Sequence, residues 1–160
     1  MTPGEARIAA AVRIATGLIF IAGGAGKLPG HFLHGGFAAS ARDMARESWP
    51  FWRDFLERAV IPHAGIFGRV VALGELALGV SLLVGLAVRA AAACGAVLMA
   101  AILLGQANVP GATWDRWITA GLTTKFALLL LVLLFAADAG QRWGLDGRRR
   151  KSGALRRPRA

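Results

Sequence analysis

The sequence predicts an all-α protein, an integral membrane four-helix bundle with a short amphipathic helical lid between its first two membrane helices. Hydrophobic residues make up 56% of the 160-residue chain, and its mean hydropathy is +0.53. An ordinary soluble domain is nearer 45–50% apolar. The apolar residues are also gathered into four segments of helical length, at about residues 8–26, 68–88, 90–105 and 118–137. We expect one domain over residues 1–141 and a tail over residues 142–160.

The first and second segments are long enough to span a bilayer, which takes about 20 apolar residues. The third is short and rich in alanine and glycine, and only Arg89 and its neighbours separate it from the second. This spacing predicts a tight antiparallel hairpin. A cleaved signal peptide is the alternative for the first segment, but residues 13–26 lack a clear small-x-small cleavage site and Lys27 follows directly.

The connection between the first two segments is patterned like two short helices. Phe37, Ala41, Met44 and Ala45 recur at helical spacing opposite charged residues, and Phe51, Phe55 and Ala59 form a second apolar stripe after Pro50. These stripes predict an amphipathic lid on the outer surface, with a partner-docking surface as the alternative.

The formal net charge of +10 is concentrated at one end of the chain. Eight of the 19 lysines and arginines lie after residue 141, against one acid, Asp146. A basic run beside an apolar helix is typical of the cytoplasmic side of a membrane. We therefore expect a disordered cytoplasmic tail that binds anionic lipids and not nucleic acid, with both termini inside the plasma (inner) membrane. The tryptophans agree, because all five lie outside the apolar runs, as interfacial anchors do.

Ionisable residues inside the apolar segments are the candidate site. Glu75 lies near the middle of the second segment, and Lys125 lies inside the fourth. Charged groups at such depth cost at least ~2.5–3.5 kcal/mol, so they face partners or cavities. Arg13 and Lys27 of the first segment are further candidates. Each of these four charged residues lies on a helical stripe that contains small residues. The stripes are Arg13, Gly17, Phe20, Gly24 and Lys27; Gly68, Ala72, Glu75 and Gly79; and Gly121, Lys125, Leu128 and Val132.

Depth along each segment predicts that Glu75 pairs with Arg13 or Lys125. Three interpretations stay open for Arg13, Lys27, Glu75 and Lys125: a structural charge network, a pocket for a ligand or a proton, and snorkelling toward the interface. Excess positive charge around one acid favours an anionic or quinone-like ligand.

Other sites carry weaker signals. His31, His34 and His63 share the outer connection, but no cysteine or obvious acidic ligand accompanies them, so we expect no metal site. Cys94, among alanines, is expected to be a small buried packing residue. The sequence shows no Walker, Rossmann or GxSxG motif, and we expect no self-contained catalytic residues.

Three stretches resemble the DoxX family of small four-helix bacterial membrane proteins: RIATGLIFIAGGAGK (Arg13–Lys27), GELALGVSLLVGLAVRAAA (Gly74–Ala92) and WGLD (Trp143–Asp146). The last resembles the family's closing glycine-x-aspartate element. The resemblance implies a plasma-membrane four-helix bundle and quinone-linked redox chemistry. With one cysteine, the chain has no thiol pair to carry electrons itself.

We therefore expect an accessory subunit of a quinone-linked membrane redox system, with quinone as its candidate cofactor. If the protein is enzymatic, it is an oxidoreductase subunit. The alternative is a small transporter or lipid-binding protein that uses the same charged pocket. The expected partners are the lipid bilayer, anionic lipids at the tail, a redox partner subunit and further copies of the chain.

Overall fold

The structure is a computed structural model that describes residues 2–106, 121–137 and 144–146. These residues form six α-helices and two short π-helical segments and contain no strand. In chain order the elements are α1 (Pro3–Lys27), η1 (Phe32–Gly36), α2 (Phe37–Arg46), α3 (Pro50–Phe55), η2 (Leu56–Val60), α4 (Ala64–Val84), α5 (Val88–Leu104) and α7 (Leu122–Ala136). The predicted all-α class is confirmed.

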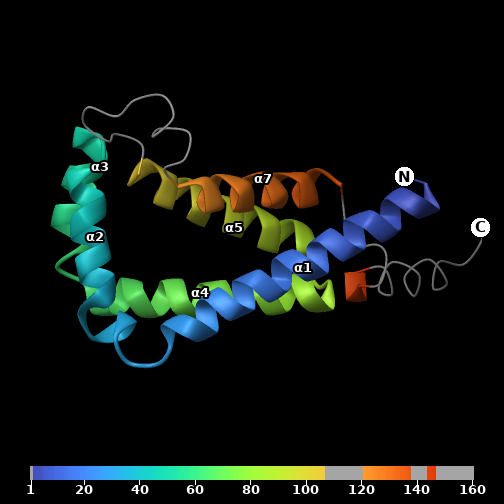
Figure 1. The fold of residues 1–160 in the computed structure, drawn as a ribbon, viewed down its shortest axis with the longest axis horizontal. Coiled ribbons are helices and arrows are strands. Elements are labelled where there is room, and N and C mark those ends of the chain that lie inside the picture. Colours follow the sequence, from blue (N-terminus) through green and yellow to red (C-terminus); the bar gives the residue numbers. More distant parts are fainter. Residues whose placement is uncertain (1, 107–120, 138–143, 147–160) are drawn as a thin grey trace, which may run out of the picture.

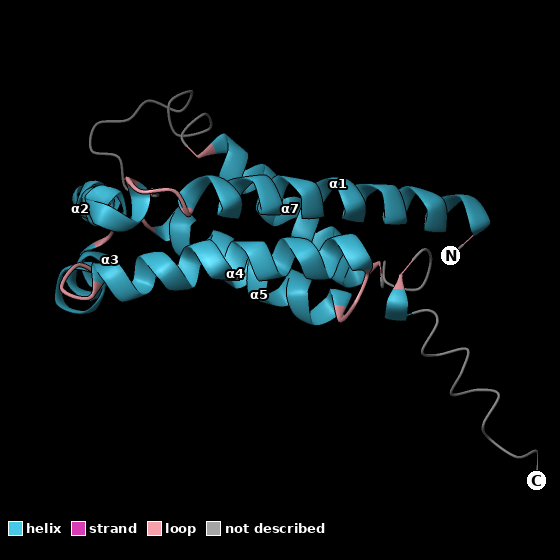
Figure 2. Ribbon diagram, turned by 90° about the horizontal axis from the view of Figure 1, so that it is seen from below, coloured by secondary structure: helices cyan, strands magenta, loops and turns pink. Residues whose placement is uncertain are grey.

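Four long helices run side by side as two antiparallel pairs, α1 along α4 and α5 along α7 (Figure 1). The shorter α2 and α3 lie across the end of the bundle opposite the N-terminus (Figures 1 and 2). In the part of the chain that is described, α1 and α4 are long and apolar enough to cross a membrane, while α5 and α7 are shorter apolar helices.

Local sequence signals set the helix ends. α1 begins with a capping box, in which the Thr2 hydroxyl accepts from the Glu5 amide and the Glu5 carboxylate accepts from the Thr2 amide. α4 ends at Val84 because Gly85 adopts a left-handed conformation with φ 68°. The amides of Gly85 and Leu86 then donate to the carbonyls of Leu82 and Ser81, as in a Schellman motif. The predicted tight hairpin is confirmed, although α4 begins and ends four residues earlier than expected.

Glycines let α1 approach α4 at backbone distance. An ideal Cβ at Gly17 would lie 2.9 Å from the Gly79 carbonyl oxygen and 2.9 Å from the Leu83 nitrogen. One at Gly24 would lie 2.9 Å from the Ala72 oxygen and 2.8 Å from the Leu76 nitrogen. Seven residues forward along α1 therefore correspond to seven residues back along α4. This repeat keeps the same face of each helix in contact over two turns.

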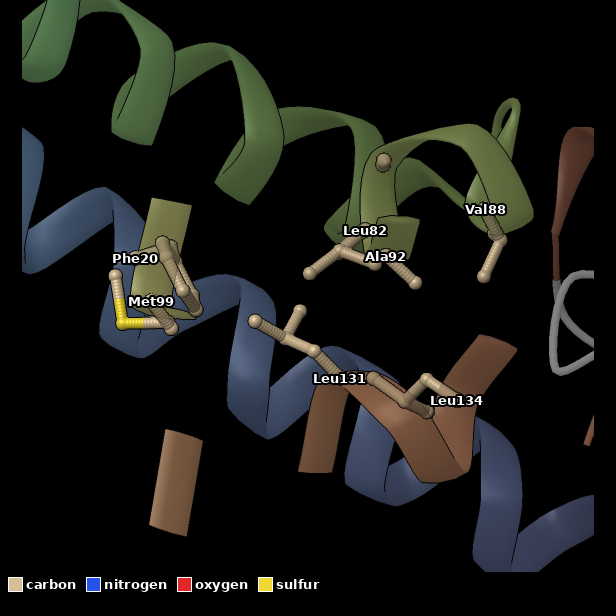
Figure 3. Packing of buried hydrophobic residues seen from close by; sticks show 8 residues of the cluster. Phe20, Leu82, Val88, Ala92, Met99, Leu131 and Leu134 are labelled. Carbon is tan, nitrogen blue, oxygen red and sulfur yellow. The ribbon is translucent and has the colours of Figure 1, made fainter. Parts of the chain in front are cut away.

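The two predicted small-residue stripes that form this interface are confirmed. Arg13, Gly17, Phe20 and Gly24 are buried on α1, and Gly68, Ala72, Glu75 and Gly79 are buried on α4. The main apolar core lies alongside, where side chains of all four long helices converge (Figure 3). Its buried residues are Phe20, Leu82, Val88, Ala91, Ala92, Met99, Leu131 and Leu134.

Two predictions about buried faces were wrong. On α7 the buried residues are Leu131 and Leu134, whereas Val132, on the predicted stripe, is 49% exposed. A helix that is leucine-rich on every side carries little periodic signal to mark its inner face. Cys94 is exposed on α5, although its small neighbours suggested burial.

The lid has a small apolar core of its own. Ala41 and Ala45 of α2 pack with Leu56 and Val60 of η2, which continues α3. The predicted α2 stripe is therefore confirmed. The second predicted stripe does not face α2: Phe51 is 64% exposed and Phe55 is 42% exposed, and the residues that face α2, Leu56 and Val60, lie one position later.

Several predictions lie outside the described residues. They concern the first residues of the fourth predicted segment, Trp114, Trp117, Trp143, and the tail apart from Gly144–Asp146.

The α1–α4 contact predicts a position-specific effect of adding one methyl group. Gly24→Ala should lower the free energy of unfolding by roughly 1–3 kcal/mol, since its new Cβ meets backbone atoms of α4 that cannot rotate away. Gly26→Ala is the matched control, because nothing lies within 4 Å of its Cβ position. Unfolding in mixed detergent micelles measures both variants. Equal stability of the two would contradict the close packing.

Candidate functional site

The candidate site is an ion pair between the end of α1 and the middle of α4. The Nζ of Lys27 lies within hydrogen-bond contact of both carboxylate oxygens of Glu75. The Glu75 side chain is 6% exposed and that of Lys27 is 29% exposed. The acid is thus enclosed between helices, while its cation reaches it from a more open position.

The structure corrects the expected partner of Glu75. Lys27 forms the ion pair, and the ion pairs among the described residues do not join Glu75 to Arg13 or to Lys125. The prediction treated the ends of neighbouring helices as lying side by side. In the structure, the end of α1 instead lies beside the interior of α4. Gly24 lies level with Ala72–Leu76, so Lys27 lies about one turn beyond Glu75 and its long side chain reaches back.

Arg13 and Lys125 lie elsewhere. Arg13 is level with Gly85, ten residues or about 15 Å along α4 from Glu75. Lys125 belongs to α7, which packs mainly along α5. The four predicted residues are therefore not one cluster: the structure brings two of them together.

Aromatic and glycine residues surround the ion pair. The Lys27 ammonium lies 5.6 Å from the centre of the Phe32 ring, within the range of a cation–π contact. Phe32 meets Phe37 edge to face, and Phe37 packs on Gly68 of α4. On the α1 side, a Cβ at the exposed Gly23 would lie 3.4 Å from the Glu75 Oε2, and no other atom of the described residues outside α1's own backbone lies within 4 Å of it. The absence of a side chain at Gly23 thus leaves one side of the carboxylate lightly covered.

The arrangement offers complementary hydrogen-bonding groups to a ligand. The ammonium of Lys27 has three donors, and the carboxylate of Glu75 accepts hydrogen bonds. Lys27 is 29% exposed and Gly23 is exposed, so the ammonium is open to solvent while the carboxylate, 6% exposed, lies beneath Gly23. The ammonium can therefore donate to a carbonyl or acidic group that lies against this side of α1.

Arg13 occupies a second, enclosed polar centre at the other end of the α1–α4 interface. Its side chain is fully buried against the turn between α4 and α5, where a Cβ at Gly85 would lie 1.6 Å from the Arg13 Nη1. Glycine is thus required at this position both for its positive φ and for the space that Arg13 fills.

The segment Gly144–Asp146 closes this turn from outside. The Asp146 carboxylate accepts from the amides of Ala87 and Val88 at 2.9 and 3.0 Å, so it caps the start of α5. The Asp146 amide donates to the Gly85 carbonyl at 3.0 Å. The carboxylate also attracts the charge of Arg13. The glycine-x-aspartate element was recognisable in the sequence, but the contact of Asp146 with Val88 was not, because the two residues lie 58 positions apart.

The histidines do not form a cluster in the described ranges, where no three metal-ligating side chains lie together. His34 bonds instead to the Gly30 carbonyl, with 2.6 Å between Nδ1 and the oxygen.

Comparison with known families found one match. The DoxX family model matches residues 8–106, which are 99 of the 160 residues and include Arg13, Lys27 and Glu75. The curated proteins and the solved structures gave no match.

The ion pair predicts a double-mutant signature. Glu75→Gln should lower the free energy of unfolding by about 3 kcal/mol, the low end for a broken buried pair, because Lys27 is partly exposed. Adding Lys27→Met should recover much of the loss, whereas adding Lys125→Met should not. Unfolding in detergent micelles measures all three. Recovery with Lys125→Met instead would overturn the assigned partner.

The Asp146 cap predicts a local effect. Asp146→Ala should lower stability by about 0.5–2 kcal/mol, the usual cost of losing a cap, and should speed hydrogen exchange at the amides of Ala87 and Val88. Asp54→Ala is the control, since its ion pair with Arg58 is exposed on the lid. Unchanged exchange at both amides in Asp146→Ala would show that Asp146 does not cap α5.

Proposed function

Because this chain belongs to the DoxX family of membrane proteins, we propose that it is an accessory, non-catalytic subunit of a quinone-linked redox system. The observation that carries the proposal is the Lys27–Glu75 pair beside Gly23. It is a polar centre in an apolar bundle, and a ligand can reach it from the side.

The residues present fit a quinone headgroup. A quinone presents carbonyl oxygens that accept hydrogen bonds, and Lys27 supplies donors. Its ring is flat, and exposed Gly23 places no side chain over the Glu75 carboxylate. Phe32, against which the Lys27 ammonium lies, adds an aromatic surface at the same place. Lys27 is thus suited to orient the ring, and Glu75 to hold the Lys27 ammonium in place beside it.

The redox chemistry belongs to the quinone and to a partner subunit. A bound quinone takes up electrons and protons when it is reduced. The chain has a single cysteine, so it has no thiol pair with which to deliver electrons. Its own contribution is to bind the headgroup through the Lys27 ammonium, which Glu75 holds in place.

The proposal includes a topology. All four long helices cross the plasma membrane, with the lid outside and both termini in the cytoplasm. α1 and α4 are long enough for this, and the shorter α5 and α7 can be accommodated by local thinning of the bilayer. The concentration of basic residues after residue 141 supports a cytoplasmic C-terminus.

A co-purification experiment tests the quinone proposal. The parent protein, extracted from native membranes in mild detergent, should carry quinone that mass spectrometry detects in proportion to protein. Gly23→Leu should lose most of it, because the new side chain covers the Glu75 carboxylate. Gly26→Leu is the matched control on the same helix, where a Cβ meets nothing within 4 Å.

Two results would reject the proposal: a parent protein without quinone, or equal quinone in Gly23→Leu and Gly26→Leu. Substrate flux in liposomes that contain this chain alone would instead support the alternative function of a small transporter.

A further inference from the structure

The lid contains an open cavity that the ion pair does not use. It has a volume of about 420 Å³ and lies between α2 and the α3–η2 helix. Its lining consists of Arg42, Ala45, Arg46, Arg53, Glu57 and Ile61. The volume falls within the roughly 300–1,000 Å³ of small-molecule sites.

The fold concentrates positive charge in this cavity. Between residues 37 and 60 the lid carries four arginines and four acids, so it is neutral as a whole. Three of the four arginines nevertheless line the cavity, with one acid, Glu57. The fourth arginine, Arg58, is paired with Asp54 at 3.5 Å and does not line it.

Arg53 is held in place by the lid itself. Its Nε donates to the Ala45 carbonyl at 2.8 Å, a bond that joins α3 to the end of α2. The side chain is half-buried, so its guanidinium is oriented before any ligand arrives. Arg42 and Arg46 are exposed on α2, across the cavity mouth, where Arg46 also bonds to Asp43 at 3.2 Å. Planar guanidinium groups match the oxygens of a phosphate in a two-point geometry.

The position of the lid favours a lipid over a dissolved ion. α2 and α3 lie across the end of the apolar bundle, which in a membrane is the level of the headgroups (Figure 1). Trp49, Phe51 and Phe55 of the same lid are 47%, 64% and 42% exposed. Phe51 and Phe55 lie two positions from Arg53, on the opposite face of the helix, as in an amphipathic helix whose apolar side enters the membrane and whose basic side lies at the headgroups. Exposed aromatic side chains of this kind anchor amphipathic helices in the interface.

We propose that the lid cavity binds the phosphate of an anionic phospholipid headgroup through Arg42, Arg46 and Arg53. The aromatic side chains hold the lid at the depth where that phosphate lies. This site is separate from the Lys27–Glu75 pair and does not depend on the proposed redox role. Glu57 weakens the site, because its charge opposes that of the phosphate.

The test uses the full-length protein in neutral detergent and short-chain phosphatidylglycerol, with bound lipid counted by native mass spectrometry. Arg42→Gln with Arg46→Gln should weaken binding about twenty-fivefold, at roughly fivefold per basic residue near a membrane surface. Glu57→Gln should strengthen it about fivefold. Arg58→Gln is the control for charge alone, since it removes one positive charge from the same lid outside the cavity. The basic tail is intact in every variant and contributes the same background.

Thermal unfolding checks that each variant is folded, and the gain expected in Glu57→Gln cannot result from misfolding. The proposal fails if the double variant and Arg58→Gln bind phosphatidylglycerol equally, or if Glu57→Gln shows no gain. It also fails if phosphatidylcholine binds as tightly. Inorganic phosphate that binds as strongly as the lipid would overturn the lipid as the occupant.

Discussion

The close contact between α1 and α4 positions the charged groups Lys27, Glu75 and Arg13. Gly17 and Gly24 meet backbone atoms of α4, so the two helices cannot slide past each other without a clash. Membrane helices lack a hydrophobic drive to associate, and close packing between small residues takes its place. With that register fixed, Lys27 reaches Glu75 at one level and Arg13 reaches the Gly85 turn at another.

These two polar centres differ in what they can do. Arg13 is enclosed by its own helix, the Gly85 turn and the segment that ends at Asp146, so no ligand approaches it without displacing part of the fold. Arg13 thus connects α1, the Gly85 turn and the Gly144–Asp146 segment, which are distant from one another in the sequence. Glu75 is equally buried, but its cation is partly exposed and Gly23 leaves it lightly covered. Because of this difference in accessibility, the proposed quinone site is the Lys27–Glu75 pair and not Arg13.

The sequence predicted most of the fold because its signals were periodic. Glycines and charges repeat at helical spacing on α1 and α4, and that pattern identified the buried face of each helix. After Lys125, α7 is apolar on every side, so nothing in those residues distinguished Leu131 from Val132. Charge partners were harder to predict, because periodicity gives the direction of a side chain but not the offset between helices. That offset depends on where α4 begins beneath the lid.

The lid illustrates the same limit at a smaller scale. Its helices could be predicted from the stripe on α2, but its cavity depends on how α2 lies against the α3–η2 helix. Arg53 bonds to Ala45, eight positions earlier and on the other helix. Helical periodicity describes residues of one helix, so it could not predict this contact between two helices. A neutral segment thus becomes positive on one side only after it folds. Binding sites made of residues from several helices are consequences of packing, which is why the phosphate site emerges from the structure and not from the sequence.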